Sequence, residues 1–453
     1  MVQFDEKEYG LSKEKLSSVF DSGTFVELGA YVKREETETL EGVVCGYGSI
    51  CGKLVFAFVQ DSGRAKGAFD EKHSKKIAAT YSLAVKNGAP IIGIFDSAGA
   101  YVQDGAAALA AYGKLMKCVS DASGVIPQIA IIDGVCGGSS AVVASMFDLV
   151  ITVKDKSKLF VNAPFNVGQQ SATAMGYSAY EAENGEDAYR FARELVLTLP
   201  ENNTALAYVD TADDPCRATD VDLKSCDAAT AVSTLADDGR FITLFEGYAE
   251  NVKVGLASFG GILCGVVASD KKNGGALDVK SARVASKLLS FCDSFGIPVL
   301  TLVDSVGIEV SSEAEASSYA SELARLAYAY TSSDNAKVSV VMGKAYGAAF
   351  TLLGSKSVGA DIALALPDAK VSVLSPEASV AFLWNDKVGD KSREELEAEW
   401  SEKCASAKNA CDLGEIDYIV EPCELRARIC AAFSMLCAKA EGTPTRKHVN
   451  MPL

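Results

Sequence analysis

Residues Gly88–Ala100 read GAPIIGIFDSAGA, and residues Gly296–Ile308, far down the chain, read GIPVLTLVDSVGI. Each copy begins with glycine and proline around a small or branched residue, continues through an apolar run, and ends in Asp-Ser and a glycine. This pattern predicts a buried parallel strand that ends in a loop. The shared positions, all at one offset, are Gly88 and Gly296, Pro90 and Pro298, Asp96 and Asp304, Ser97 and Ser305, and Gly99 and Gly307.

The similarity extends in both directions and indicates a duplication of the whole fold. GKLVFAFVQD matches GILCGVVASD upstream, and IIDGVCGGSS matches VVMGKAYGAA downstream. Alternating strands and amphipathic helices predict an α/β protein with a mostly parallel sheet in each half. We expect two domains, residues 1–212 and 213–453, and interpret the polar stretch 202–239 as the connection between them.

Composition limits the class of protein. The chain has 453 residues, 49% of them hydrophobic, and a net charge of −17, which argues against a sequence-independent nucleic-acid surface. Its start, MVQFDEKEYG, lacks the features of a signal peptide, and no apolar run is long enough to span a bilayer, so a cytoplasmic location is expected.

The 13 cysteines contain no CxxC pair, which makes a zinc ribbon improbable. Cysteines recur every seven residues near the C-terminus, and this spacing favours a buried helix face over a metal site. The cysteines concerned are Cys404 and Cys411, and Cys423, Cys430 and Cys437.

Two glycine loops are candidates for catalysis. Gly137 and Gly138 in one half, and Gly347 in the other, follow a predicted strand and precede a helix of small residues. Backbone N–H groups at such a turn can stabilise an oxyanion, although the same glycines could simply allow close helix packing. The chain has only two histidines, His73 and His448, and no GxSxG motif, which disfavours a histidine triad. His73 is expected to be solvated, and a base that arrives on substrate or cofactor is indicated.

Nearly the whole chain resembles the carboxyltransferase subunits of biotin-dependent acyl-CoA carboxylases, above all the propionyl-CoA carboxylase β subunit, and the α subunits of methylmalonyl-CoA and glutaconyl-CoA decarboxylases. The resemblance implies two crotonase-type (ClpP/crotonase) halves, each a ββα superhelix. It rests on QDSGRAKGAFDEKHSKKI, GAPIIGIFDSAGAYVQDG, ASGVIPQIAIIDGVCGG, ALDVKSARVASKLLSFCDSFGIP, KAYGAAF, GEIDYIVEPCELRARI and the closing RKHVNMPL.

The resemblance also implies roles for particular residues. The first loop would hold the acyl-CoA thioester as an enolate, and the second the ureido carbonyl of carboxybiotin. Tyr101 stands where an arginine is common, and Thr351 where an aspartate often accompanies propionyl-CoA preference, so the acyl group stays open. The implied catalytic residues are Gly137, Gly138, Ser139, Gly347 and Ala348; the substrate-binding residues are Ala98, Gly99, Ala100, Tyr101, Tyr346 and Thr351; and Asp304, Gly307, Gly347 and Ala348 would bind biotin.

The implied assembly is a homohexamer, a trimer of antiparallel dimers with sites between halves of different subunits. Its partners would be a biotin carboxyl carrier protein and either a biotin carboxylase or a membrane sodium-pumping decarboxylase subunit, with no metal in this chain. Two alternatives stay open: a crotonase-type hydratase or isomerase without biotin, with Glu309 or Asp104 as its carboxylate, and a non-catalytic subunit.

Overall fold

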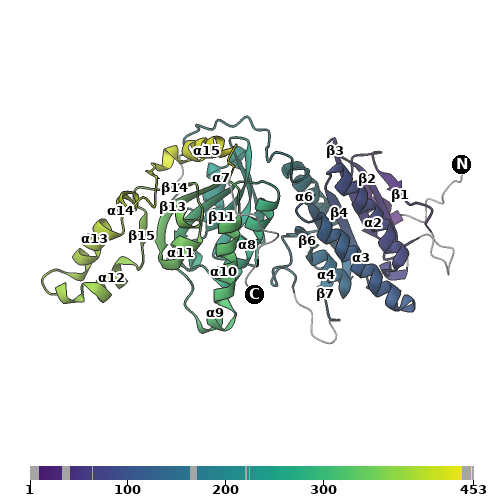
Figure 1. Cartoon of the computed structure of the whole chain (residues 1–453), viewed down its shortest axis with the longest axis horizontal. Helices are drawn as coiled ribbons and strands as arrows, with labels where there is room; N and C mark the ends of the chain where they lie inside the picture. The colour runs from purple at the N-terminus through teal and green to yellow at the C-terminus, as the bar shows by residue number, and fades with distance from the viewer. Residues whose placement is uncertain are drawn as a thin grey trace. The chain divides into compact units, whose positions relative to one another are not determined.

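The computed structural model describes residues 10–32, 41–63, 65–163, 171–219, 222–223, 225–440 and 450. The chain folds into two compact units, Met1–Leu206 and Ala207–Leu453, and the described part of each contains one eight-stranded sheet (Figure 1). Arg64, His448 and all of the closing RKHVNMPL motif except Asn450 lie outside the described residues.

The sheet of the first unit has the strand order β1-β2-β3-β4-β5-β6-β8, with β7 paired to the end of β5. The first three strands are antiparallel, and β3, β4, β5 and β6 are parallel to one another. The predicted buried strand is β4, at the centre. The strands are β1 (Val26–Leu28), β2 (Val43–Ile50), β3 (Lys53–Gln60), β4 (Ile91–Ser97), β5 (Gln128–Gly137), β6 (Leu149–Val153), β7 (Lys158–Phe160) and β8 (Tyr180–Ala182).

Helices cover both faces of this sheet. On one face, α2 (Glu71–Asn87) and α3 (Ala106–Ala122) lie side by side, and α4 (Ser139–Ser145) follows β5 (Figure 1). On the other face, α1 (Gly10–Val19) contacts α6 (Gly185–Thr198). Helix α2 begins at the N-cap Asp70, whose carboxylate accepts the His73 N–H, and ends at Gly88, whose φ of 60° suits glycine. An amphipathic helix that ends at a glycine therefore packs on this face of the sheet.

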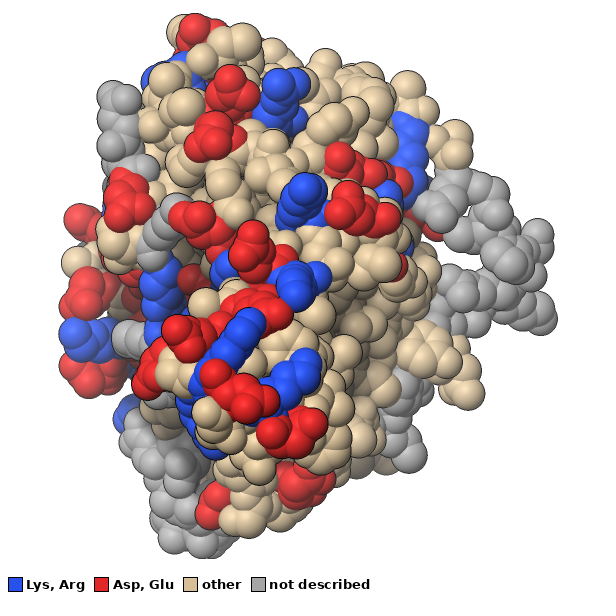
Figure 2. Space-filling model, turned by 90° about the vertical axis from the view of Figure 1, so that its left-hand side faces the viewer, with Lys and Arg blue, Asp and Glu red and all other residues tan. Residues whose placement is uncertain are grey.

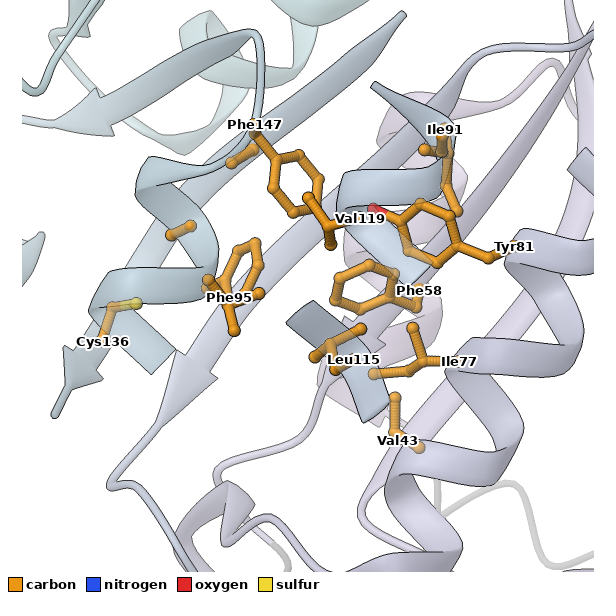
Figure 3. Packing of buried hydrophobic residues seen from close by; sticks show 14 of the residues in the cluster. Val43, Phe58, Ile77, Tyr81, Ile91, Phe95, Leu115, Val119, Cys136 and Phe147 are labelled. Atoms are coloured by element: carbon orange, nitrogen blue, oxygen red, sulfur yellow. The ribbon is translucent and has the colours of Figure 1, made fainter. Parts of the chain in front are cut away.

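The core of the first unit lies between the sheet and the α2–α3 layer. Figure 3 shows Phe58, Phe95 and Phe147 meeting there, with Ile77 from α2 and Leu115 from α3 packed beside them. The three phenylalanine rings make edge-on contacts, with centroids 5.4–6.4 Å apart. Alternate residues of β4 and β5 point to this layer, and the others point to the helices on the opposite face. Both strands are therefore apolar along most of their length.

The second unit repeats the first. Its strand order is β16-β14-β13-β12-β11-β10-β9 with β15 paired to the end of β13, and the second predicted strand is β12. The predicted duplication is thus present in three dimensions. Its strands are β9 (Phe241–Leu244), β10 (Val252–Phe259), β11 (Ile262–Ser269), β12 (Val299–Ser305), β13 (Lys337–Tyr346), β14 (Ile362–Ala365), β15 (Lys370–Ser372) and β16 (Tyr418–Ile419).

Among the described residues, the second unit has more helices at its C-terminal end than the first unit, namely α12 to α15. Figure 1 shows α12 and α13 side by side, and the structure packs α15 on β10 and β13. The helices are α7 (Ala228–Leu235), α8 (Val279–Ser294), α9 (Ser312–Ala316), α10 (Tyr319–Ser332), α11 (Gly347–Leu352), α12 (Pro376–Leu383), α13 (Arg393–Cys404), α14 (Ala407–Asp412) and α15 (Leu425–Leu436).

Two expectations about local structure were wrong. The stretch 202–239 is not only a connection, because α7 forms within it behind the N-cap Asp227 and buries Val232 and Leu235 in the second core. The heptad cysteines do not share a buried face: Cys430 is buried, but Cys423 precedes α15, Cys437 follows it, and both are exposed. The buried face of α15 is built by Leu425, Ile429 and Phe433 instead.

Candidate active site

The glycine turn of the first unit lies between β5 and α4. Gly138 is the N-cap of α4 with φ 59° and ψ −126°, a conformation that only glycine adopts readily. Its N–H donates to the carbonyl of Phe160 at 2.9 Å, so this N–H is already engaged. No partner among the described residues takes the N–H groups of Ser139 and Ser140. These two N–H groups are therefore the donors that the turn can offer to a ligand.

The loop that follows β4 approaches this turn. Gly99 has φ 114°, and a Cβ atom placed on it would lie 3.8 Å from the carbonyl oxygen of Gly137. Its N–H donates to Ser97 Oγ at 3.2 Å, and the N–H of Tyr101 donates to Phe69 O at 2.9 Å. The structure thus brings the predicted group Ala98, Gly99, Ala100 and Tyr101 to the predicted group Gly137, Gly138 and Ser139.

The second unit repeats this arrangement. Gly307 has φ 132°, its Cβ position would lie 3.7 Å from the carbonyl oxygen of Tyr346, and its N–H donates to Ser305 Oγ at 3.2 Å. Gly347 has φ 58° and opens α11. Tyr346 pairs with Ser372 of β15 as Gly137 pairs with Phe160 of β7, and in the first unit this pairing engages the N–H of the glycine that follows, so Ala348, which corresponds to Ser139, is the donor that this turn can offer to a ligand. Thr351, one helical turn beyond Gly347, is exposed on α11.

An aspartate supports each pair of loops. Asp96 Oδ1 accepts the N–H of Val135 at 3.2 Å, and Asp304 Oδ1 accepts the N–H of Lys344 at 2.8 Å. Both bonds lie where the register of the parallel strands shifts. Asp304 was predicted as a biotin-binding residue, and the structure gives its carboxylate this backbone contact within its own unit.

Two groups near the first turn were missed from sequence. The hydroxyl of Tyr112 on α3 lies 2.6 Å from Ser140 Oγ, and both residues are buried. On the opposite face of the sheet, Lys15 Nζ lies 2.8 Å from the buried carboxylate of Asp133. Burial would raise the pKa of Asp133, but hydrogen bonds from Lys15 and Lys156 hold it below its usual value. Lone tyrosines and lysines on amphipathic helices give no signal of such partners.

The expectation that His73 is solvated was wrong, because its side chain is fully buried. Its Nδ1 lies 3.5 Å from the Glu41 carboxylate, and its Nε2 lies 3.5 Å from the Gln60 amide. Burial lowers the pKa of His73, although Glu41 opposes that shift. The charged sequence DEKHSKK hid the fact that His73 lies on the inward face of α2.

The surface seen in Figure 2 mixes Lys and Arg with Asp and Glu, without a continuous basic area among the side chains coloured there. On α13, for example, Glu399 pairs with both Lys391 and Lys403. Within the described ranges, no group of three or more His, Cys, Asp or Glu side chains is placed to hold a metal ion. No described helix has the length and apolarity needed to cross a membrane.

Comparison with known proteins shows the family of this chain. The model of the carboxyl transferase domain family matches residues 9–451. The chain belongs to this family. The carboxyl transferase fold is duplicated in the way the sequence predicted, and the two glycine turns lie at corresponding places in the two halves.

Individual carboxyl transferases are similar over almost their whole length. The α subunit of methylmalonyl-CoA decarboxylase from Veillonella parvula is 33% identical over 476 residues, which cover 98% of this chain and 93% of the relative. The β chain of propionyl-CoA carboxylase from Roseobacter denitrificans is also 33% identical, with the same coverage. The predictions of the family and of a biotin-dependent carboxyltransferase are confirmed.

A solved structure supports the fold. The transcarboxylase 12S structure, a hexamer with methylmalonyl-CoA and methylmalonic acid bound, superposes with a TM-score of 0.92. It is 29% identical, and the match covers 97% of this chain and 92% of that one. The prediction of two crotonase-type halves is therefore confirmed.

Proposed function

We propose that this carboxyltransferase moves a carboxyl group between biotin on a separate carrier protein and a short acyl-CoA, through an enolate of the thioester. Residues 1–212 would form the acyl-CoA half and residues 213–453 the biotin half. The observation that carries the proposal is the presence of two related glycine turns, each of which opens a short helix, and in the first of them no described residue engages the N–H groups of Ser139 and Ser140.

In the first unit, the N–H groups of Ser139 and Ser140 would donate to the thioester oxygen. Negative charge develops on that oxygen as the α-carbon loses its proton, so preorganised donors stabilise the transition state more than the ground state. Gly138 sets the direction of the turn through its positive φ, and Gly99 leaves room for the acyl group because it carries no side chain, whereas the space beside Gly137 is filled by the Phe160 ring. The neighbouring Ala98, Ala100 and Tyr101 would border the acyl chain.

In the second unit, the N–H of Ala348 would donate to the ureido carbonyl of biotin, and Gly347 would set the direction of the turn through its positive φ. Residues with a side chain rarely adopt the φ of 58° found at Gly347, so glycine suits this turn. Carboxylated biotin supplies the transferable carboxyl group and, after its loss, the base for the α-proton. Gly307 and Tyr346 would flank the ring, and Asp304 would act by holding the strand end behind them.

The acyl group is the least constrained part of the proposal. Tyr101 donates its hydroxyl to Gln103 Oε1 at 2.6 Å and therefore presents an uncharged, partly buried side chain beside the first turn. Thr351 is uncharged as well. A short acyl chain such as propionyl, without a carboxylate in need of an arginine, is the substrate class these residues favour.

The proposal extends to the assembly and the partners of this chain. The transcarboxylase 12S structure is a hexamer. Both units expose large apolar side chains, and a second copy of the chain would cover them, as we propose for a homohexamer. The carboxyl donor would be a biotin carboxyl carrier protein served by a biotin carboxylase or a membrane decarboxylase. The apolar side chains are Val102, Leu109 and Val161 in the first unit, and Val310, Val373 and Phe382 in the second.

The test is transfer from methylmalonyl-CoA to free biotin, with calorimetric titration of propionyl-CoA binding. Gly347→Val should abolish transfer and leave CoA-thioester binding nearly intact, because the two turns serve different ligands. Gly296→Val is the matched control: Gly296 has φ 63° in open space, so the variant carries the same backbone strain away from the turns. Absence of any transfer by the wild-type protein would contradict the proposal, and equal loss of transfer and binding in Gly347→Val would reverse the assignment of the halves.

A further inference from the structure

A buried tyrosine ties α3 to the first glycine turn. Tyr112 is 3% exposed and Ser140 is 1% exposed, and their hydroxyl oxygens are 2.6 Å apart. Ser140 is the second residue of α4, and its own N–H is one of the two donors of the turn. A hydrogen bond to this side chain therefore restrains the residue whose backbone N–H faces the candidate site.

The same tyrosine also supports the neighbouring loop. Its ring stacks on Phe69, with centroids 4.3 Å apart and an angle of 22° between the planes. Phe69 N–H donates to Gly99 O, and Phe69 O accepts the N–H of Tyr101, both at 2.9 Å. Tyr112 thus contacts both Ser140, in the glycine turn, and Phe69, which holds the loop after β4. These two segments border the acyl-CoA half-site.

The second unit lacks this connection to its helix. There the tyrosine at the start of α10, Tyr319, donates its hydroxyl to the carbonyl of Leu277 and accepts the N–H of Glu309. Its hydroxyl thus joins the segment before α8 to the loop after β12. Ala349, which corresponds to Ser140 in the duplicated sequence, has no hydroxyl. The two half-sites therefore have the same backbone arrangement. A tyrosine–serine hydrogen bond restrains the glycine turn in the first unit, and Ala349 cannot form such a bond in the second.

We propose that Tyr112 and Ser140 are positioning residues for the acyl-CoA half-site, which hold the N–H groups of Ser139 and Ser140 in the geometry that stabilises the thioester enolate. This inference rests on the proposed function. A turn held by one hydroxyl pair can shift when the pair is lost, and a displacement of about 1 Å at a reacting centre can lower a rate on the order of a hundredfold. Ground-state binding, which depends on the rest of the ligand, is less sensitive.

The pair acts without a change of charge. Burial raises the pKa of Tyr112 to about 12, even though hydrogen bonds to Ser140 and Ser97 favour its ionised form. The phenol is therefore neutral throughout the range in which enzymes are assayed. Its loss should lower kcat and leave the shape of the pH–rate profile unchanged, which separates positioning from acid–base catalysis.

The experiment compares Tyr112→Phe, Ser140→Ala and the double variant with Tyr81→Phe. Tyr81 is a matched control in the same unit: its buried hydroxyl donates to Gln128 Oε1 at 2.9 Å, at the opposite end of β5. Each protein is assayed for transfer from methylmalonyl-CoA to free biotin, for propionyl-CoA affinity by calorimetry, and for amide hydrogen exchange over residues 137–145.

We expect kcat to fall about tenfold or more in Tyr112→Phe, with affinity for propionyl-CoA within about twofold of wild type. The double variant should lose no more than the worse single variant, because each substitution removes the same hydrogen bond between Tyr112 and Ser140. Exchange over residues 137–145 should quicken in Tyr112→Phe and stay unchanged in Tyr81→Phe. Because exchange needs no turnover, it decides the positioning role even if wild-type transfer fails, which would contradict the proposed function instead.

The inference would be overturned by unchanged exchange at the turn in Tyr112→Phe, by an unchanged kcat despite faster exchange, or by an equal loss of kcat in Tyr81→Phe. A parallel loss of affinity and kcat would also overturn it, since that pattern indicates a general role in ligand binding.

Discussion

Asp96 Oδ1 accepts the N–H of Val135 at 3.2 Å and occupies the space that a side chain on Gly134 would need. The second unit repeats the relationship, since Asp304 Oδ1 lies 2.6 Å from where a Cβ atom on Gly343 would be. Each aspartate bridges two neighbouring strands at the point where their pairing shifts. In each unit the aspartate and the glycine of the next strand thus act together. They hold the ends of the two strands close, and so position the loops that follow those strands beside the candidate site.

Gly134→Ala should destabilise the first unit by about 1–3 kcal/mol, because the new methyl group must displace the Asp96 carboxylate. Gly113→Ala is the control. Gly113 lies exposed within α3 with no atom within 4 Å of its Cβ position, so alanine there should stabilise by about 0.5–1 kcal/mol. Chemical denaturation of both variants tests the prediction, and a loss of stability no greater in Gly134→Ala than in Gly113→Ala would refute it.

Ser139→Pro should lower kcat about 10²- to 10³-fold, the usual effect of losing one oxyanion donor. Ser139 is the first residue of α4, a position where proline is tolerated, so the substitution removes an N–H without breaking the helix. Ser139→Ala keeps the N–H and should stay close to wild type. Inactivity of Ser139→Ala with an intact fold would instead make the hydroxyl essential, as in a hydrolase.

Arg426→Ala should destabilise the second unit by about 3–5 kcal/mol, because it leaves the buried Asp237 carboxylate without its cationic partner. The Arg426 guanidinium is fully buried, lies 2.7 Å from Asp237, and ties α15 to the segment that carries α7. Arg428→Ala, two residues on, removes an exposed contact with Glu424 of 3.7 Å and should cost less than about 1 kcal/mol. Similar unfolding midpoints for the two variants would show that the buried pair contributes little.

The stability of the first unit should fall as the pH drops below about 6.5, the ordinary pKa of histidine. Burial lowers the pKa of His73 in the folded state, so the unfolded chain binds a proton that the folded chain does not, and acid favours unfolding. The slope from this group cannot exceed about 1.4 kcal/mol per pH unit. Glu41, Asp70 and Lys76 act on the same ring, so the measurement is the difference in slope between wild type and His73→Gln from pH 7.5 to 5.5. Identical slopes would mean that His73 does not titrate differently on folding.

Much of the fold could be predicted because the duplication repeats the same sequence constraints in both halves of the chain. The apolar runs that became β4 and β12 and the glycines that follow β5 and β13 were predicted. These features follow from local rules of strand burial and turn geometry. The loops after β4 and β5, and after β12 and β13, could be paired in advance for the same reason, since parallel strands end at one edge of a sheet.

Tertiary structure decided what single side chains do. His73 is buried although its sequence neighbours are charged, and Cys423 and Cys437 are exposed although their spacing suggested a buried face. Burial is set by where a helix begins and which neighbour covers it, and neither is encoded in a residue's local pattern.

The sequence by itself determined the duplicated α/β architecture, the family and the two glycine turns, because each depends on backbone conformation and on apolar periodicity that recur along the chain. Only the tertiary structure decided which N–H groups in those turns are open. Gly138 donates to Phe160, and Tyr112 meets Ser140, through contacts between segments that no spacing rule connects. A donor is available to a ligand only if the folded chain leaves it unpaired, and that property belongs to the packed molecule.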